Sequence, residues 1–187
     1  MKDAIQLLEV RRKAFYLENR NIYLCYMHKI LRLYNSINQY GTLNELELTV
    51  LGKGHIRYEM EVKQKHLATP IAIHGGVLSA MMDAILGVAS LSSSCHEGKL
   101  VSTVEFKINY LAPARLGDLL IGEGKIIQKG NRLIVAEGDI KLKGTDQFIA
   151  KGIGTFSAYP IEKAGIFEHL SQEQKEILGD EYASYFA

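Results

Sequence analysis

An acidic residue interrupts an otherwise apolar run of the sequence, which reads HGGVLSAMMDAILGVASL over residues 74–91. Apart from His74, Asp83 is the only acidic or basic residue in this run. Burial of an ionised carboxylate without partners is costly, and aspartate is a mediocre helix former, so the position needs a compensating role. A carboxylate placed in this way can serve as a general base or as a nucleophile. The structural alternative is a buried side chain that caps a loop or pairs with a lysine.

A histidine followed by two glycines, His74-Gly75-Gly76, opens the same run. The N-terminus of a helix offers unpaired backbone N–H groups and a partial positive charge, and both suit a developing oxyanion. Glycine leaves these amides accessible to a ligand. The motif and Asp83 together predict that a carbonyl group is polarised at the helix N-terminus and is attacked with the help of the carboxylate.

The spacing of these two features predicts a second subunit. His74 and Asp83 are nine residues apart, which on a helix separates them by about 13.5 Å along the axis and by about half a turn. They therefore cannot act on one carbonyl from one chain. Two such helices, antiparallel across a two-fold axis, would bring Gly75 of one subunit toward Asp83 of the other, so we expect a homodimer.

Small residues share the helix stripe that contains Asp83, at the spacing of one helical face. These residues are Gly76, Ser79, Ala80, Gly87 and Ser90. The opposite side is bulky and is expected to pack against a sheet; it carries Val77, Leu78, Met81, Ile85 and Val88. A stripe without bulky side chains lets a ligand or a second subunit approach the helix backbone closely.

The segments around this helix have the patterns of a sheet and of terminal helices. Polar and apolar residues alternate in six segments, which predicts half-buried strands over 45–50, 56–63, 101–111, 118–128, 132–143 and 148–158. Short hairpin connections rich in turn residues permit only antiparallel pairing. Residues 1–38 lack Gly and Pro and predict one or two helices, and Ser171 is an N-cap for a final helix over 172–178. We expect an α+β fold in which a curved antiparallel sheet of about six strands wraps one central helix.

Composition and charge limit the partners of the chain. Its 187 residues are 47% hydrophobic and carry a net charge of +1, which gives no reason to expect nucleic acid or a membrane surface as partner. Basic residues outnumber acidic ones seven to three over residues 1–40, and acidic residues outnumber basic ones six to two over 161–187, so we expect the terminal helices to dock on each other. The sequence has neither a signal-peptide core nor an uninterrupted apolar stretch of 18 residues, and a cytoplasmic location is expected.

Several other residues that could carry chemistry are interpreted as structural. Cys25 and Cys95 are too few and too far apart for a disulfide framework, and no Cys/His spacing typical of zinc occurs. Five tyrosines of the N-terminal segment indicate packing rather than a cofactor site; they are Tyr16, Tyr23, Tyr26, Tyr34 and Tyr40. We expect no metal and no cofactor.

A family resemblance emerges from the strand hairpin, the HGG motif, the Asp nine residues after His74, and the segment VEFKINYLAPARLGD over 104–118. Together they resemble the PaaI-like branch of the hotdog thioesterases, within the 4-hydroxybenzoyl-CoA thioesterase-like superfamily. The resemblance covers residues 41–158 and implies a hotdog domain over 41–160, between a helical extension over 1–40 and a helical tail over 161–187. It implies hydrolysis of acyl-CoA thioesters with small aryl or short to medium acyl groups, by a dimer or a dimer of dimers.

The resemblance also implies roles for individual residues. Asp83 is expected to be the nucleophile or general base, the Gly75 N–H to polarise the carbonyl, and His74 to orient the thioester. The hydroxyl of Thr103 is expected to position water, although a threonine there also suits a strand. Substrate-binding residues are expected at Gly76, Ser79, Lys129, Gly130 and Arg132, the last three in a turn that would hold the phosphates of coenzyme A, with Arg115 as a further candidate.

The chain departs from the family pattern upstream of the histidine. Ala68 stands where relatives often carry Asn, and Ile71 where they often carry Gly. The missing carboxamide leaves open a hotdog module that binds acyl-CoA without cleaving it, such as a sensor. A hotdog dehydratase or hydratase is a third reading, but no matching His loop is present. A DNA-binding regulator is disfavoured because residues 1–40 contain no glycine turn between two compact helices.

Overall fold

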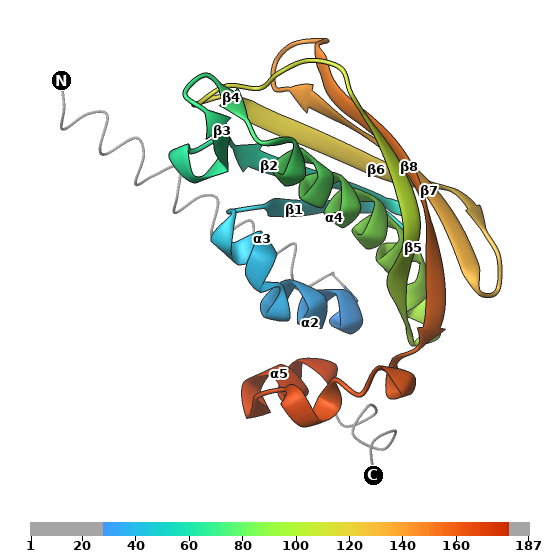
Figure 1. The fold of residues 1–187 in the computed structure, drawn as a ribbon. Helices are drawn as coiled ribbons and strands as arrows, with labels where there is room; N and C mark the ends of the chain where they lie inside the picture. Colours follow the sequence, from blue (N-terminus) through green and yellow to red (C-terminus); the bar gives the residue numbers. More distant parts are fainter. Residues whose placement is uncertain (1–27, 180–187) are drawn as a thin grey trace.

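A six-stranded antiparallel sheet curls around the long helix α4, Gly75–Ser94, in the computed structural model of the protein (Figure 1). The structure describes residues 28–179. The strand order in the sheet is β1-β2-β6-β7-β8-β5, so β1 and β5 form its two edges. The predicted hotdog architecture, a curved sheet around one central helix, is confirmed.

The strands follow the alternating segments of the sequence closely. They are β1 (Glu47–Gly52), β2 (His55–Glu61), β5 (Lys99–Tyr110), β6 (Leu119–Lys129), β7 (Leu133–Leu142) and β8 (Phe148–Pro160). A small ladder of β3 (Leu67–Thr69) and β4 (Ala72–Ile73) was not predicted, because strands this short show no alternation. The predicted hairpin across residues 111–118 is wrong: β5 pairs with β8, and β6 pairs with β2 and β7. Alternation reports which face of a strand is buried, and it does not report the neighbouring strand.

Glycines on the inner face of the sheet let α4 lie very close to it. A methyl group at Gly124 of β6 would lie 2.8 Å from the carbonyl oxygen of Ile85, and one at Gly152 of β8 would lie 2.8 Å from the Met82 side chain. Any larger residue would push the helix away from the strands. Met81 and Ile85 of the predicted bulky side therefore pack on the sheet, together with Met82, and all three are fully buried. Val88, predicted for the same side, lines a pocket beside the helix α2 (Lys29–Ile37).

The central helix is apolar enough to resemble a membrane span. By length and hydropathy alone, the helical segment Gly75–Glu97, which includes the 3₁₀ turn η2 (Cys95–Glu97), would suffice to cross a bilayer. The sheet curls around it, however, and more than half of its most apolar window is buried (Figure 1). It is the core helix of the domain.

Helices from the N-terminal end of the described chain lie over the side of α4 that the sheet leaves open, and the C-terminal helix packs on them (Figure 1). The helix α2 (Lys29–Ile37) is followed by α3 (Gln39–Leu43), and α5 (Gln172–Leu178) lies against α2 (Figure 1). Ser171 caps α5 as predicted, because its side chain accepts the backbone N–H of Gln174 at 3.2 Å. The expected docking of terminal helices is thus met by α2 and α5. Five of the seven basic residues of 1–40 and two of the six acidic residues of 161–187 lie outside the described residues.

Candidate active site

Asp83 and Thr103 meet where the edge strand β5 passes the middle of α4. The Thr103 hydroxyl donates a hydrogen bond to Asp83 Oδ1 at 2.8 Å. In β5, Thr103 pairs with Phe156 and Glu105 with Thr155, so Val104 is an extra residue that forms a bulge. A bulge reorients the side chains beside it. Here it lets Thr103 turn toward the helix, while exposed Glu105 accepts a hydrogen bond from the Thr155 hydroxyl of β8 at 2.8 Å.

His74 caps α4 rather than standing free at its start. Its Nδ1 accepts the backbone N–H of Gly76 at 2.8 Å, so the ring proton of the neutral side chain lies on Nε2. A methyl group at Gly76 would lie 2.8 Å from the same Nδ1, which explains the glycine at this position. The second glycine of the motif thus makes room for the histidine cap.

The first glycine of the motif keeps its amide available. Among residues 28–179 no acceptor receives the Gly75 N–H, whereas its neighbours Gly76 and Val77 donate to the side chain and the carbonyl of His74. An N–H at the first turn of a 20-residue helix also carries the partial positive charge of the helix dipole. The Gly75 amide is therefore available to a carbonyl oxygen, and its role in polarising one stays a prediction.

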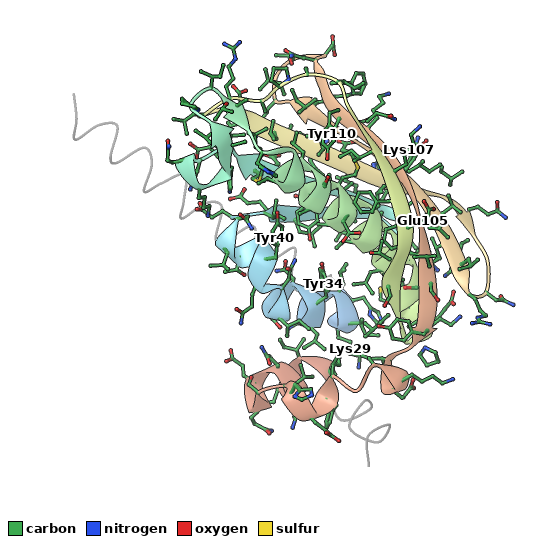
Figure 2. The ribbon with its side chains drawn as sticks, viewed as in Figure 1. Lys29, Tyr34, Tyr40, Glu105, Lys107 and Tyr110 are labelled. Atoms are coloured by element: carbon green, nitrogen blue, oxygen red, sulfur yellow. The ribbon has the colours of Figure 1, made fainter. Side chains whose placement is uncertain are left out.

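Tyr110, at the end of β5, lies over this helix N-terminus and was missed by the sequence analysis. Its hydroxyl donates to the Gly75 carbonyl at 3.2 Å and makes a short hydrogen bond with the Ser79 hydroxyl. A methyl group at Gly75 would lie 3.5 Å from the Tyr110 ring. Figure 2 labels Tyr110 on the same strand as Glu105 and Lys107. The family-like segment 104–118 contains this tyrosine, but sequence spacing does not predict its neighbours, because these are set by how β5 crosses the helix.

The two halves of the candidate site do not meet within one chain. Gly75 and Asp83 lie eight residues apart on one straight helix, about 12 Å along its axis. Gly75 is next to Tyr110, and Asp83 is next to Thr103, seven residues earlier on β5. The amide and the carboxylate therefore face separate positions along the edge of the domain.

The small stripe of α4 is only partly open. Ser90 is buried and donates its hydroxyl to the Leu86 carbonyl at 2.9 Å, and a methyl group at Gly87 would lie 3.3 Å from the Phe156 ring. Ser90 is therefore closed to a ligand, contrary to the expectation for the whole stripe, whereas Gly87 packs near Phe156 and still lines a pocket. Gly76 is exposed and Ser79 is half-buried, so the N-terminal half of the stripe remains accessible.

The basic turn predicted for the phosphates lies at the far end of the domain. Lys129 donates to the Ser93 carbonyl at 3.1 Å and forms a short ion pair with Glu97, next to the C-terminus of α4. Hydrogen bonds from Lys129 and Lys99 lower the pKa of the Glu97 carboxyl to about 2. Gly130 and Arg132 are exposed in the same turn. Within one chain, this turn and the amide of Gly75 are at opposite ends of α4.

Arg115 and the two departures from the family pattern lie near the N-terminus of α4. The Ala114 carbonyl accepts the N–H of Ile73, which places exposed Arg115 beside the strand that leads into the helix. Ala68 and Ile71 are exposed on β3 and in the turn that follows it. The structure thus makes Arg115 the basic residue nearest to the Gly75 amide among the phosphate candidates.

An apolar pocket of about 360 Å³ opens beside Asp83 and Thr103. One wall is α4; the opposite wall is α2 with the start of α3, including Tyr34, Asn38 and Tyr40. Burial raises the pKa of the Tyr34 hydroxyl, and the charge of Asp83 raises it further, so this phenol stays protonated near the carboxylate. In Figure 2, Tyr34 and Tyr40 lie between these helices and the rest of the domain. The sequence analysis had interpreted both as packing residues.

Other reactive groups in the described part of the chain are not arranged for chemistry. Burial raises the pKa of the Cys95 thiol to about 11, so it is not a nucleophile near neutral pH. Cys25 lies outside the described residues. No cluster of three or more His, Cys, Asp or Glu side chains within residues 28–179 could hold a metal ion.

Comparisons with known proteins agree with this fold. Residues 72–149, from β4 into β8, match the thioesterase superfamily. A putative esterase of Saccharolobus solfataricus is 30% identical over 128 residues, which are 68% of this chain and 88% of that protein. Human acyl-coenzyme A thioesterase 13 is 27% identical over 110 residues, 59% of this chain and 77% of that one.

A solved structure adds a ligand to the comparison. The protein smu.793 from Streptococcus mutans, determined with bound acetyl CoA, is 28% identical and superposes with a TM-score of 0.56. The match covers 62% of this chain and 89% of that chain.

Proposed function

The chain belongs to the thioesterase superfamily, and from this premise we propose that it hydrolyses acyl thioesters of coenzyme A with Asp83 as its catalytic carboxylate. The chain is a thioester hydrolase by family. Coenzyme A as the thiol of the substrate is supported by the similarity to human acyl-coenzyme A thioesterase 13 and to the acetyl-CoA-bound protein of S. mutans. The observation that carries the proposal is the carboxylate of Asp83, held by Thr103 at the mouth of an apolar pocket.

The arrangement supports a general-base mechanism. Water attacks the thioester carbonyl carbon while Asp83 takes up one of its protons, and Thr103 holds Oδ1 of the carboxylate in place. The oxyanion of the tetrahedral intermediate accepts a hydrogen bond from the N–H of Gly75 of the partner subunit. When the carbonyl re-forms, the C–S bond breaks and the departing thiolate takes the proton from Asp83. The products are a carboxylic acid and coenzyme A, and the step needs no metal or redox partner.

A dimer is part of the proposal because the amide and the carboxylate are too far apart in one chain. The edge strand β5 supports this assembly, since it is unpaired on one side and Val104 is 58% exposed. A long exposed edge is a template for pairing with a second strand. Glu105 and Lys107 are both exposed on this edge, two residues apart (Figure 2).

The charges of this edge suggest the register of the pair. We consider two copies of β5 that pair antiparallel with Phe106 at the centre of the ladder. Glu105 of each subunit then lies opposite Lys107 of the other subunit, which gives two ion pairs across the two-fold axis. The same register sets the partner's Tyr110 opposite Ser102, next to Thr103. Because Tyr110 contacts Gly75 within its own chain, this pairing carries the partner's Gly75 toward Asp83.

The first test of this function is release of free thiol from a panel of acyl-CoA substrates. We expect turnover with at least one aliphatic or aryl acyl-CoA, at a rate that depends on Asp83. Tight binding of acyl-CoA without release of thiol would instead support the alternative of an acyl-CoA-binding module, which Ala68 suggested.

A further inference from the structure

The pocket beside Asp83 is closed by the N-terminal helix α2, which lies outside the part of the chain that matches the family. We propose that this pocket holds the acyl group, that α2 sets its length, and that the preferred substrate carries an unbranched aliphatic chain of medium length. This inference rests on the proposed function and makes its substrate class specific. Its support comes from the lining, the direction and the depth of the pocket.

One face of α4 forms a continuous wall of the pocket. The lining residues from this helix recur at the spacing of one helical face and run from Ala80 through Asp83, Ala84, Gly87 and Val88 to Leu91. Beyond Asp83 this wall presents only small or aliphatic groups. A polar acyl group would find no hydrogen-bond partner on it, whereas an alkyl chain would lose contact with water along the whole wall.

The opposite wall runs antiparallel to the first. The ring of His28, which caps α2, contacts the ring of His96 just after α4, with centroids 4.8 Å apart. The N-terminal end of α2 therefore lies beside the C-terminal end of α4. Farther along α2, the Tyr34 hydroxyl lies near Asp83, whose charge acts on it. The pocket thus has a polar mouth at Asp83 and an apolar far end near Ile30 and Leu91.

The depth of the pocket indicates the length of the chain that fits. Eight residues of α4 separate Asp83 from Leu91, which corresponds to a rise of about 12 Å. An extended backbone advances about 3.6 Å for every three bonds, and an alkyl zigzag with similar bond geometry would cover that depth with roughly ten carbons. Leu100 and Ile166 line the pocket as well, from β5 and from the C-terminal segment. The pocket therefore fits an acyl chain of about eight to ten carbons.

Polar groups at the mouth of the pocket favour binding of the thioester end of the substrate there, rather than deeper in the pocket. Asn38 donates a hydrogen bond to the Tyr34 hydroxyl at 3.4 Å, and no hydrogen bond donated by that hydroxyl is found within residues 28–179. The phenol O–H is therefore a donor available beside Asp83 and Thr103. It can donate to the attacking water or to the thioester carbonyl, so the polar end of the substrate stays at the mouth while its alkyl chain enters the pocket.

The test compares chain-length profiles of variants that shorten or lengthen the pocket. Val88→Phe fills it from α4 at mid-depth, and Leu33→Phe fills it from α2. Each buried methylene contributes roughly fourfold to binding, so loss of room for four methylenes should lower the decanoyl-to-butyryl ratio of kcat/KM about 250-fold. Leu100→Ala removes bulk at the far end and should move the optimum to a longer chain. Ile127→Phe, at an exposed position outside the pocket, is the matched control and should leave the ratio unchanged.

The outcomes separate this inference from the function on which it rests. If the wild type releases thiol from no acyl-CoA, the proposed function fails. If it hydrolyses acyl-CoA but both phenylalanine variants keep the wild-type ratio, the acyl group binds elsewhere and the inference is wrong. A wild-type preference for benzoyl-CoA over every aliphatic substrate would also overturn it. If Val88→Phe fails to fold, Leu33→Phe and Leu100→Ala still test the inference. Leu33→Phe shortens the pocket from α2, and Leu100→Ala lengthens it from β5, so the preferred chain length should shift in opposite directions.

Discussion

The hydroxyl of Thr103 donates a hydrogen bond of 2.8 Å to the carboxylate of Asp83 and so joins the edge strand of the sheet to the middle of the central helix. The bond depends on a bulge at Val104, which turns Thr103 out of the regular alternation of the strand. It also fixes one carboxylate oxygen at the mouth of an apolar pocket. A carboxylate held in one orientation can take a proton from a bound water in a reproducible geometry.

Replacement of Thr103 should separate the role of its hydroxyl from the role of its shape. Thr103→Val keeps the β-branched side chain but removes the donor, and we expect kcat to fall by about 10-fold to 100-fold, because loss of a hydrogen bond to a charged group costs about 1.5–3 kcal/mol. Thr103→Ser keeps the donor and should remain within about threefold of wild type. Thr103 is exposed, so neither change should alter the melting temperature much. Equal activity of the valine and serine variants would show that the hydroxyl has no part in turnover.

Mixed dimers should show whether two chains build each site. Asp83→Asn removes the base and should lower kcat by about 10²-fold to 10⁴-fold. Gly75→Pro removes the amide proton at the first helical position, where proline is well tolerated, and the extended backbone of His74 suits a following proline. When the two variants are co-expressed in equal amounts, half of the dimers contain one chain of each. Each mixed dimer has one intact site out of two, so about a quarter of wild-type activity should return.

Two controls accompany the mixing experiment. Asp146→Asn changes an exposed carboxylate on a loop far from the pocket and should leave kcat at the wild-type value. A mixture whose activity equals the average of the two separate variants would place the whole site within a single chain.

Charge reversal on β5 should test the register of the dimer. Lys107→Glu sets like charges opposite each other across the proposed two-fold axis, and so does Glu105→Lys, so each should weaken association. The double variant restores opposite charges and should recover the dimer. Sedimentation velocity at low salt measures the change, since screening weakens exposed ion pairs. If the double variant dissociates as much as the single ones, the strands do not pair about Phe106.

The stability of the fold should decrease as the pH falls below 6.5, in part because of His66. This buried imidazole accepts the Lys63 N–H on Nδ1 at 3.0 Å, and Nε2 lies 3.2 Å from Asn44 Oδ1. Burial lowers the pKa of His66, and Lys65 lowers it further. The unfolded chain therefore binds a proton more readily than the folded one, so the stabilisation is complete above pH 6.5 and is lost as the pH falls through the lower folded pKa.

Urea unfolding at pH 7.5 and 5.5 measures this effect. The Asn side chain of His66→Asn retains an acceptor but cannot be protonated, so its loss of stability between the two pH values should be smaller than that of wild type by about 1 kcal/mol. The stability of the variant should still depend on pH to some extent, because burial also lowers the pKa of His28. If the variant loses as much stability between pH 7.5 and 5.5 as the wild type does, His66 does not contribute to the pH dependence.

Much of the fold follows from the sequence because it depends on short-range patterns. Alternation identified the six main strands, the apolar run over 74–91 identified the central helix, and Ser171 marked the start of α5. The motif of His74 and two glycines with Asp83 downstream also pointed to the two groups on which the proposed site depends. Each of these signals depends on residues within a few positions of one another, where helix and strand geometry fix the relation between spacing and direction.

The relations between distant segments were decided only by the tertiary structure. The sequence did not reveal that β5 lies beside β8, that Tyr110 covers Gly75, or that α2 closes the pocket beside Asp83. Strand order and helix docking are chosen by how complete surfaces pack, and many sequences with the same local pattern could pack differently. The local pattern therefore supplied the reacting groups, whereas packing over the whole chain determined the pocket and the neighbours that surround them.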